Sequence, residues 1–171
     1  ILHKHQSHVI VATEPGFGCR FHILIPPFEA GNDEIEVTPG TVKLKYDGKN
    51  KHVLVVDDEE SITAFLKEYL EMYNYKVTAS NSSKEAVSFL KHADFDFDLV
   101  ITDQTMPEML GTEMIKSIHQ IDPDIPCILC SGYSEHVSEK EALQLGFSKY
   151  LNKPVDNQAL LQIMHEILEK N

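Results

Sequence analysis

The chain carries the stretch Leu99-Val100-Ile101-Thr102-Asp103-Gln104-Thr105-Met106-Pro107-Glu108-Met109-Leu110-Gly111, and the other segments can be ordered around it. Its first part is a short apolar run rich in β-branched residues, which predicts a strand buried on both faces. The run ends on the carboxylate of Asp103, and a loop containing Pro107 and Gly111 follows. Because ligands collect at the carboxyl ends of strands in open parallel sheets, Asp103 is expected at a reactive edge.

Three further apolar runs end in polar residues in the same way. The residues that follow them are Asp57-Asp58, Ser131-Gly132 and Lys153-Pro154. Three aspartates, one hydroxyl and one ammonium are therefore expected at one edge, where crowded carboxylates repel unless a cation intervenes. Mg²⁺ keeps several of its waters and needs only one or two carboxylates plus a phosphate oxygen. Since an aspartate can also form an aspartyl-phosphate, the set indicates phosphoryl transfer.

Strand and helix patterns alternate regularly from Lys51 to the end of the chain. Strands are predicted at residues 53–57, 76–80, 97–102, 126–131 and 147–151. Helices are predicted at residues 60–73, from an N-cap at Ser82 to about 92, at 111–120, at 135–145, and from about Asp156. Five such units predict an α/β fold, a doubly wound five-stranded parallel sheet in the flavodoxin-like order 2-1-3-4-5 with helices on both faces.

At these residues the chain resembles a receiver domain of the two-component response-regulator family, over residues 51–171. The matching features are the Asp57-Asp58 pair, Asp103 with Met106-Pro107 and Gly111, Ser131-Gly132, and Tyr150-x-x-Lys153-Pro154. The resemblance implies a domain that takes a phosphoryl group from a phosphohistidine onto an aspartate with Mg²⁺.

The resemblance assigns the acidic residues first. It makes Asp103 the phosphoacceptor, and it makes Asp57, Asp58, Asp103 and the backbone carbonyl of Thr105 the ligands of Mg²⁺. Taken alone, Asp103 could instead be a helix N-cap. Asp57 and Asp58 could likewise be an exposed acidic turn before a helix, where negative charge is favourable.

The remaining roles follow from the same resemblance. Lys153, which alone would be an ordinary surface lysine, is expected to pair with Asp103 and then with the phosphoryl group. Its peptide bond to Pro154 is expected to be cis. Ser131 is expected to follow the phosphoryl oxygen, and Tyr150 to turn inward as Ser131 moves. The catalytic set is thus Asp103, Lys153 and Ser131.

Two cysteines, Cys127 and Cys130, are spaced as in redox or zinc motifs. Because these cysteines are three positions apart on a strand, their side chains point to opposite faces and cannot bridge without distortion. Core packing is therefore the preferred interpretation. Three cysteines in the chain, an odd number, favour a reducing cytosol over a disulfide framework.

Residues 1–28 predict a β-hairpin with a turn at Glu14-Pro15-Gly16-Phe17-Gly18. The pattern resembles the last hairpin of a histidine-kinase ATP-binding domain, whose nucleotide-binding residues are not present here. We therefore expect no ATP binding and leave open whether the chain is part of an enzyme. Residues 29–50 predict a linker. The histidines at positions 3, 5 and 8 are interpreted as a solvated remnant, not as metal ligands.

Charge and composition exclude several classes of protein. The net charge is −12, of which residues 51–171 hold −11, and no basic patch is present, so nucleic-acid binding is not expected. No apolar run is long enough to span a membrane. The chain does not begin with Met, which suggests a fragment or processed product. We expect a cytoplasmic location for this part, whether or not a longer parent protein is anchored in a membrane.

These expectations combine into two functional hypotheses. The first is a phosphorelay receiver at the C-terminal part of a hybrid sensor histidine kinase. Its partners would be a histidine kinase, its own parent included, and a histidine phosphotransfer protein. The second is a regulatory interaction module that controls its parent kinase without passing the phosphoryl group on. Formation of a homodimer is left open.

Overall fold

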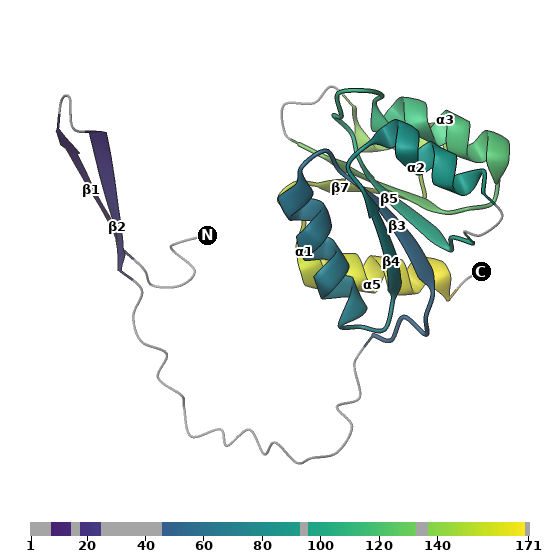
Figure 1. Ribbon diagram of the computed structural model, residues 1–171, viewed down its shortest axis with the longest axis horizontal. Helices are drawn as coiled ribbons and strands as arrows, with labels where there is room; N and C mark the ends of the chain where they lie inside the picture. Colours follow the sequence, from purple (N-terminus) through teal and green to yellow (C-terminus); the bar gives the residue numbers. More distant parts are fainter. Residues whose placement is uncertain (1–7, 15–17, 25–45, 93–95, 133–136, 170–171) are drawn as a thin grey trace, which may run out of the picture. The chain divides into compact units, whose positions relative to one another are not determined.

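The structure, a computed structural model, describes residues 8–14, 18–24, 46–92, 96–132 and 137–169 (Figure 1). The chain divides into two compact units, Ile1–Val42 and Lys43–Asn171. The second unit thus begins before the boundary at Lys51 that the sequence predicts, and it includes the end of the predicted linker.

The described residues of the first unit form a pair of β-strands. Strand β1 (His8–Glu14) pairs antiparallel with β2 (Gly18–Leu24), in a register that sets Val9 opposite Ile23. The predicted pairing of two antiparallel strands is confirmed for these residues. The predicted turn at 15–17, the histidines at positions 3 and 5, and most of the predicted linker lie outside the described residues.

In its described residues, the second unit consists of five strands and five helices in alternation. Their bounds are β3 (His52–Val56), α1 (Glu60–Glu71), β4 (Lys76–Ser80), α2 (Ser83–Leu90), β5 (Leu99–Asp103), α3 (Gly111–Ile121), β6 (Cys127–Ser131), α4 (Glu139–Gln144), β7 (Lys149–Asn152) and α5 (Asn157–Leu168). The strands form one parallel sheet in the order β4-β3-β5-β6-β7. Counted from β3 as the first strand, this is the order 2-1-3-4-5, which confirms the predicted fold class.

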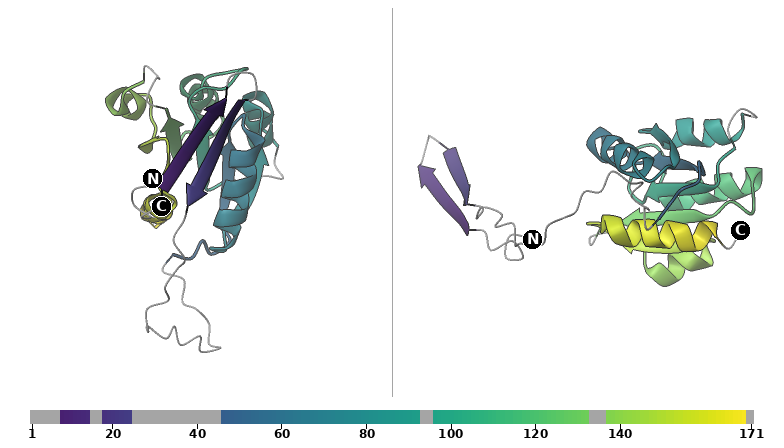
Figure 2. Two further views of the ribbon diagram at one scale, coloured as in Figure 1. Left: turned by 90° about the vertical axis from the view of Figure 1, so that its left-hand side faces the viewer. Right: turned by 90° about the horizontal axis from the view of Figure 1, so that it is seen from below.

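The two faces of the sheet carry separate apolar cores, because neighbouring residues of a strand point to opposite faces. Leu54 and Leu129 pack against α2, α3 and α4 on one face. Val53 and Val55 pack against α1 and α5 on the other (Figures 1 and 2). Strands covered on both sides must be apolar along their whole length, which explains the uninterrupted runs in the sequence.

The two cysteines of β6 lie in different cores. Cys127 belongs to the α2/α3/α4 core and Cys130 to the α1/α5 core, and both are free thiols. Burial raises the pKa of each thiol to about 12. The prediction of core packing on opposite faces is therefore confirmed.

Several predicted helix ends need correction because local capping decides them. The described helix α4 begins at Glu139, four residues after the predicted start, since Ser138 accepts a hydrogen bond from the backbone of Glu141 as its N-cap. Helices α1 and α2 each end two residues earlier than predicted. At the end of α4, Gly146 has a φ of 105°, the conformation that terminates helices.

The segment before β3 is part of the second unit. Tyr46 packs on the α1/α5 core, and its ring lies 5.6 Å from that of His165. The backbone N–H of Gly48 donates to the carbonyl of Tyr73 at 2.7 Å, and a Cβ at Gly48 would collide with Tyr75. The chain is therefore anchored to the domain several residues before the sheet begins.

Within the described residues, no helix is both long and apolar enough to cross a bilayer.

Candidate functional site

Parallel pairing brings the polar strand ends together at one edge of the sheet. The register aligns Val56 of β3 with Thr102 of β5, so Asp57 lies beside Asp103. Lys153 directly follows β7, whose carboxyl end lies at the same edge. The sequence prediction that these side chains meet is therefore confirmed for these three residues.

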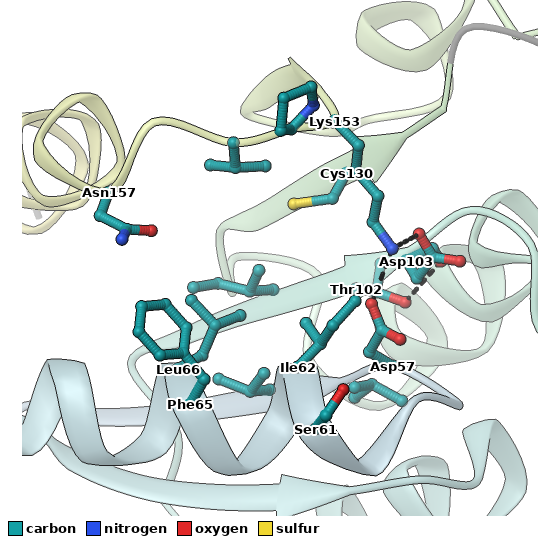
Figure 3. Close-up of a pocket in the computed structure, with 15 residues that line it drawn as sticks. Asp57, Ser61, Ile62, Phe65, Leu66, Thr102, Asp103, Cys130, Lys153 and Asn157 are labelled. Carbon is teal, nitrogen blue, oxygen red and sulfur yellow. Dashed lines mark hydrogen bonds and ion pairs between the residues drawn. The ribbon is translucent and has the colours of Figure 1, made fainter. Parts of the chain in front are cut away.

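The centre of the site is a lysine held between two aspartates. The Nζ atom of Lys153 lies 2.6 Å from Oδ1 of Asp103 and 2.8 Å from Oδ2 of Asp57 (Figure 3). Each aspartate residue is only 5% exposed. Two ionised carboxylates placed so close together would repel strongly in a poorly solvated site, and the shared ammonium offsets that repulsion.

Burial and charge act in opposite directions on these groups. Burial raises the pKa of Asp103, the neighbouring Asp57 carboxylate raises it further, and the ion pair with Lys153 only partly lowers it. Burial lowers the pKa of Lys153, but the two carboxylates outweigh it and raise the pKa overall. Lys153 is therefore a cation throughout the neutral pH range.

Each aspartate also bonds to the backbone two residues further along the chain. The N–H of Glu59 donates to Oδ1 of Asp57, and the N–H of Thr105 donates to Oδ2 of Asp103, both at 2.9 Å. These short turns leave the other oxygen of each carboxylate for Lys153. Oδ1 of Asp103 is buried and has this ion pair but no well-aligned hydrogen bond among the described residues.

The loop after Asp103 is closed by Gln104, a residue that the sequence did not single out. Its buried side chain accepts from the N–H of Thr112 at 3.2 Å and donates to the Thr112 hydroxyl at 3.3 Å. Its carbonyl accepts from the N–H of Gly111 at 2.9 Å. Nothing in the spacing of the sequence indicates this contact, because a glutamine next to an expected site residue has no distinctive pattern.

Gly111 is required where α3 begins. A Cβ at this position would collide with the backbone carbonyl of Asp103 and with the side chain of Leu129. The helix can therefore start close behind the site only because residue 111 has no side chain.

A largely apolar pocket of about 580 Å³ adjoins the acids. It lies over the α1/α5 face of the sheet, with Ile62, Phe65 and Leu66 of α1 on one side and Asn157 of α5 on the other (Figure 3). Its polar end is formed by the lysine and the two aspartates. Phe65 is 49% exposed, which is unusual for a phenylalanine beside a cavity.

Comparison with known proteins gives the family. Residues 53–165 match the family described as response regulator receiver domain. The chain belongs to this family. It is 34% identical over 119 residues to the response regulator SaeR of Staphylococcus aureus, a match covering 70% of this chain and 51% of that protein. The chain thus spans about half the length of the curated relatives it matches.

Solved receiver structures have the same fold. A receiver domain protein from Clostridium thermocellum has a TM-score of 0.66 at 29% identity, covering 70% of this chain and 95% of that one. A CheY-like receiver from Methanospirillum hungatei has a TM-score of 0.65 at 29% identity, with 70% and 94% covered. The second unit is therefore the receiver domain of a two-component response regulator.

The other predicted site residues of the receiver are placed as follows. Ser131 ends β6, is fully buried, and its carbonyl accepts from the N–H of Lys153 at 2.8 Å. The ring of Tyr150 packs on the α2/α3/α4 core, and its hydroxyl donates to Asn152 at 3.3 Å. The Lys153–Pro154 peptide bond is cis, as predicted.

Two predicted metal ligands lie at the surface of the receiver. Asp58 and Thr105 are exposed, next to the buried Asp57 and Asp103 respectively. Among the described residues, no group of three or more His, Cys, Asp or Glu side chains is arranged to hold a metal ion. Asp57 and Asp103 converge instead on the Lys153 ammonium.

The donor set nevertheless fits Mg²⁺. A single cation, the Lys153 ammonium, already bridges the two carboxylates, so they are close enough to share one. Carboxylate and carbonyl oxygens are the ligands that Mg²⁺ prefers, and one or two carboxylates suffice when water and phosphate complete the octahedron.

Proposed function

We propose that this receiver accepts a phosphoryl group from a phosphohistidine onto Asp103. A carboxylate oxygen of Asp103 bonds to phosphorus as the bond from phosphorus to the imidazole nitrogen breaks, and the imidazole leaves as the neutral base after taking up a proton. The observation that carries the proposal is the position of Asp103, paired with the Lys153 ammonium at the carboxyl edge of the sheet. Phosphoryl transfer of this kind depends mainly on positioning and charge neutralisation.

The charges of the site determine how each residue would contribute. Mg²⁺, held by Asp57, Asp58, Asp103 and the carbonyl of Thr105, would neutralise the charge that develops on the phosphoryl oxygens. Lys153 keeps Asp103 ionised before transfer, and its ammonium is then near enough to pair with the new phosphoryl group. A fixed cation in a poorly solvated site stabilises such charge more than water does.

We infer that the signal leaves the site through Ser131 and Tyr150. The aspartyl-phosphate adds a dianionic group with strong acceptor oxygens beside the end of β6. The Ser131 hydroxyl would turn to donate to it, and Tyr150 would then turn inward, altering the surface of α4 and β7. The partly buried ring of Tyr150 and its weak hydrogen bond to Asn152 are consistent with two alternative positions.

The phosphodonor is proposed to be a histidine kinase. The next acceptor of the phosphoryl group is proposed to be a histidine phosphotransfer protein. The half-exposed Phe65 and the apolar pocket beside Asp103 offer such a partner a surface next to the reacting group. The first unit, which resembles a kinase hairpin, supports a kinase as the donor.

The experiment is phosphorylation by acetyl phosphate with Mg²⁺, followed by intact-mass analysis. The wild-type chain is expected to gain one phosphoryl group, Asp103→Asn to gain none, and EDTA to suppress the reaction. The control is Asp124→Asn, which removes an exposed carboxylate after α3 and should react like the wild type. Labelling that persists in Asp103→Asn would overturn the assignment.

The relay and the regulatory module can be separated with the same material. Phosphorylated receiver is mixed with a purified histidine phosphotransfer protein, and both masses are followed. A relay loses its phosphoryl group to the partner, whereas a regulatory module retains it.

A further inference from the structure

Asn81 connects three elements at the edge of the site. It follows β4 and is exposed to solvent, yet its side-chain amide nitrogen makes two hydrogen bonds to other elements. Nδ2 donates to the backbone carbonyl of Asp57 at 2.8 Å and to Oγ1 of Thr63 in α1 at 3.0 Å. The Thr63 hydroxyl donates in turn to the carbonyl of Glu60 at 3.1 Å.

The orientation of this amide is fixed by its partners. A backbone carbonyl can only accept, and the Thr63 hydroxyl already uses its hydrogen toward Glu60. Both bonds therefore require the amide nitrogen of Asn81, and neither could be made by its oxygen. Bonds joined in such a chain reinforce one another.

The bond to Asp57 differs in kind from the other bonds of that residue. The side-chain oxygens of Asp57 accept from Glu59 and Lys153, and a cation arriving at the site would compete directly with Lys153. The backbone of Asp57 is held by its N–H to Ser80 at 3.3 Å and by its carbonyl to Asn81. These backbone bonds do not involve the carboxylate and can persist when its partners change.

The same bond also fixes the peptide that joins Asp57 to Asp58. The carbonyl of Asp57 belongs to that peptide plane, so Asn81 sets its orientation. The direction in which the exposed Asp58 side chain leaves the backbone depends on this plane.

We propose that Asn81 is a positioning residue for the acidic pair Asp57-Asp58, holding it in the orientation that binds Mg²⁺. The inference rests on the proposed function, because it deepens the metal site of the same reaction. Asn81 touches neither the phosphoryl group nor the metal; it acts through the backbone of Asp57, with Thr63 as its second anchor.

The test measures Mg²⁺ affinity separately from turnover. The backbone amide shifts of the full chain are followed by NMR as MgCl₂ is added, for the wild type and for Asn81→Ala. Loss of one hydrogen bond to an anchoring carbonyl is expected to raise the Mg²⁺ dissociation constant by about two- to tenfold. The rate of phosphorylation by acetyl phosphate should fall at low Mg²⁺ and recover toward the wild-type rate at saturating Mg²⁺.

Three further variants separate positioning from general destabilisation. Thr63→Ser keeps the hydroxyl and should keep the wild-type affinity, whereas Thr63→Val removes the anchor and should weaken Mg²⁺ binding in the same direction as Asn81→Ala. Gln162→Ala removes an exposed carboxamide bond to Glu166 on α5 and should leave the affinity unchanged. Thermal unfolding in EDTA should give similar midpoints for Asn81→Ala and Gln162→Ala.

The outcomes distinguish this inference from the proposed function. An unchanged dissociation constant in Asn81→Ala overturns the inference and leaves the proposed function standing. Unfolding of Asn81→Ala, or an unchanged affinity in Thr63→Val, shows a role in folding only and also overturns it. If the wild type itself binds no Mg²⁺, the metal role in the proposed function is wrong, and the inference fails with it.

Discussion

The Lys153 ammonium lies 2.6 Å from the Asp103 carboxylate and, through its second contact, joins it to Asp57 across two adjoining strands. Residues 50 positions apart in the sequence, Asp103 and Lys153, thus form one charged unit. Burial works against the ionised form of Asp103, and the ammonium works for it. The balance between these two effects leads to the first prediction.

Lys153→Met keeps the length of the side chain and removes its charge. At about pH 7 the free energy of unfolding should fall by about 1–3 kcal/mol, because two buried carboxylates are left facing each other without a cation. The raised pKa of Asp103 gives the sign of the pH dependence: the loss should shrink in mild acid, because Asp103 takes up a proton there and no longer needs the ammonium. Urea unfolding of the wild type and the variant, at about pH 7 and in mild acid, measures this difference in the free energy of unfolding.

The control for that variant is Lys84→Met. Its ammonium lies 3.8 Å from Glu108 at the surface, and such pairs contribute little, so its stability should hardly change at either pH. A loss in Lys153→Met that is the same at both pH values would contradict the charge argument.

Gly111→Ala and Gly146→Ala form a matched pair of backbone substitutions. Each should lower the free energy of unfolding by about 1–3 kcal/mol, the first through collision with the Asp103 carbonyl and the second through a φ of 105° and contact with His119. Only the first disturbs the backbone of Asp103. Under conditions where both variants are folded, acetyl phosphate should label Gly146→Ala at the wild-type rate and Gly111→Ala more slowly. Equal rates would show that the approach of α3 does not matter for the reaction.

The buried ring of His52 should make the folded protein less stable in mild acid. Burial lowers its pKa, helped by the charge of Lys76, and the ring contacts the Thr78 hydroxyl at 2.8 Å. In the unfolded chain the His52 imidazole takes up its proton near the ordinary pKa of about 6.5. Its contribution to the free energy of unfolding is therefore fully present above that pH and is lost as the pH drops through the lowered pKa of the folded state. The free energy of unfolding, measured with urea between about pH 7.5 and 5.5, should therefore fall with decreasing pH. The slope of this fall should be flatter in His52→Gln than in the wild type. His92→Gln, at an exposed position, should retain the wild-type slope; a His52→Gln slope equal to it would refute the prediction.

The start of the receiver can be tested by truncation. Residues 43–171 should unfold at the same urea concentration as the receiver in the full chain, whereas residues 51–171 should be less stable by about 1–3 kcal/mol. The shorter chain loses the half-buried ring of Tyr46 and the backbone bond of Gly48 to Tyr73. Tyr46→Ala in the longer chain should reproduce most of the loss. Equal stability of both truncated chains would place the boundary at Lys51 after all.

Some sequence expectations stay predictions because no described contact bears on them. The Mg²⁺ ligands, the movement of Ser131 and Tyr150, and the kinase origin of the hairpin are of this kind.

Sequence patterns were sufficient to predict the sheet, its strand order and the identity of the central residues. Buried parallel strands need uninterrupted apolar runs, and a charged residue at the end of such a run must emerge at the carboxyl edge. Asp57, Asp103 and Lys153 could therefore be assigned to one place before any distance was known, and the α1 and α5 helices to their apolar faces by periodicity.

How those residues are held depends on the packing of the elements in three dimensions. Lys153 lies between two carboxylates and not against one, Gln104 closes the loop, and Asn81 ties Asp57 to α1. Such contacts join polar side chains from elements that are distant in sequence, and each requires a distance and an angle that no apolar pattern encodes. The sequence places a residue on an edge or a face; the partner it bonds there depends on how the packed elements bring donors and acceptors within about 3 Å of each other.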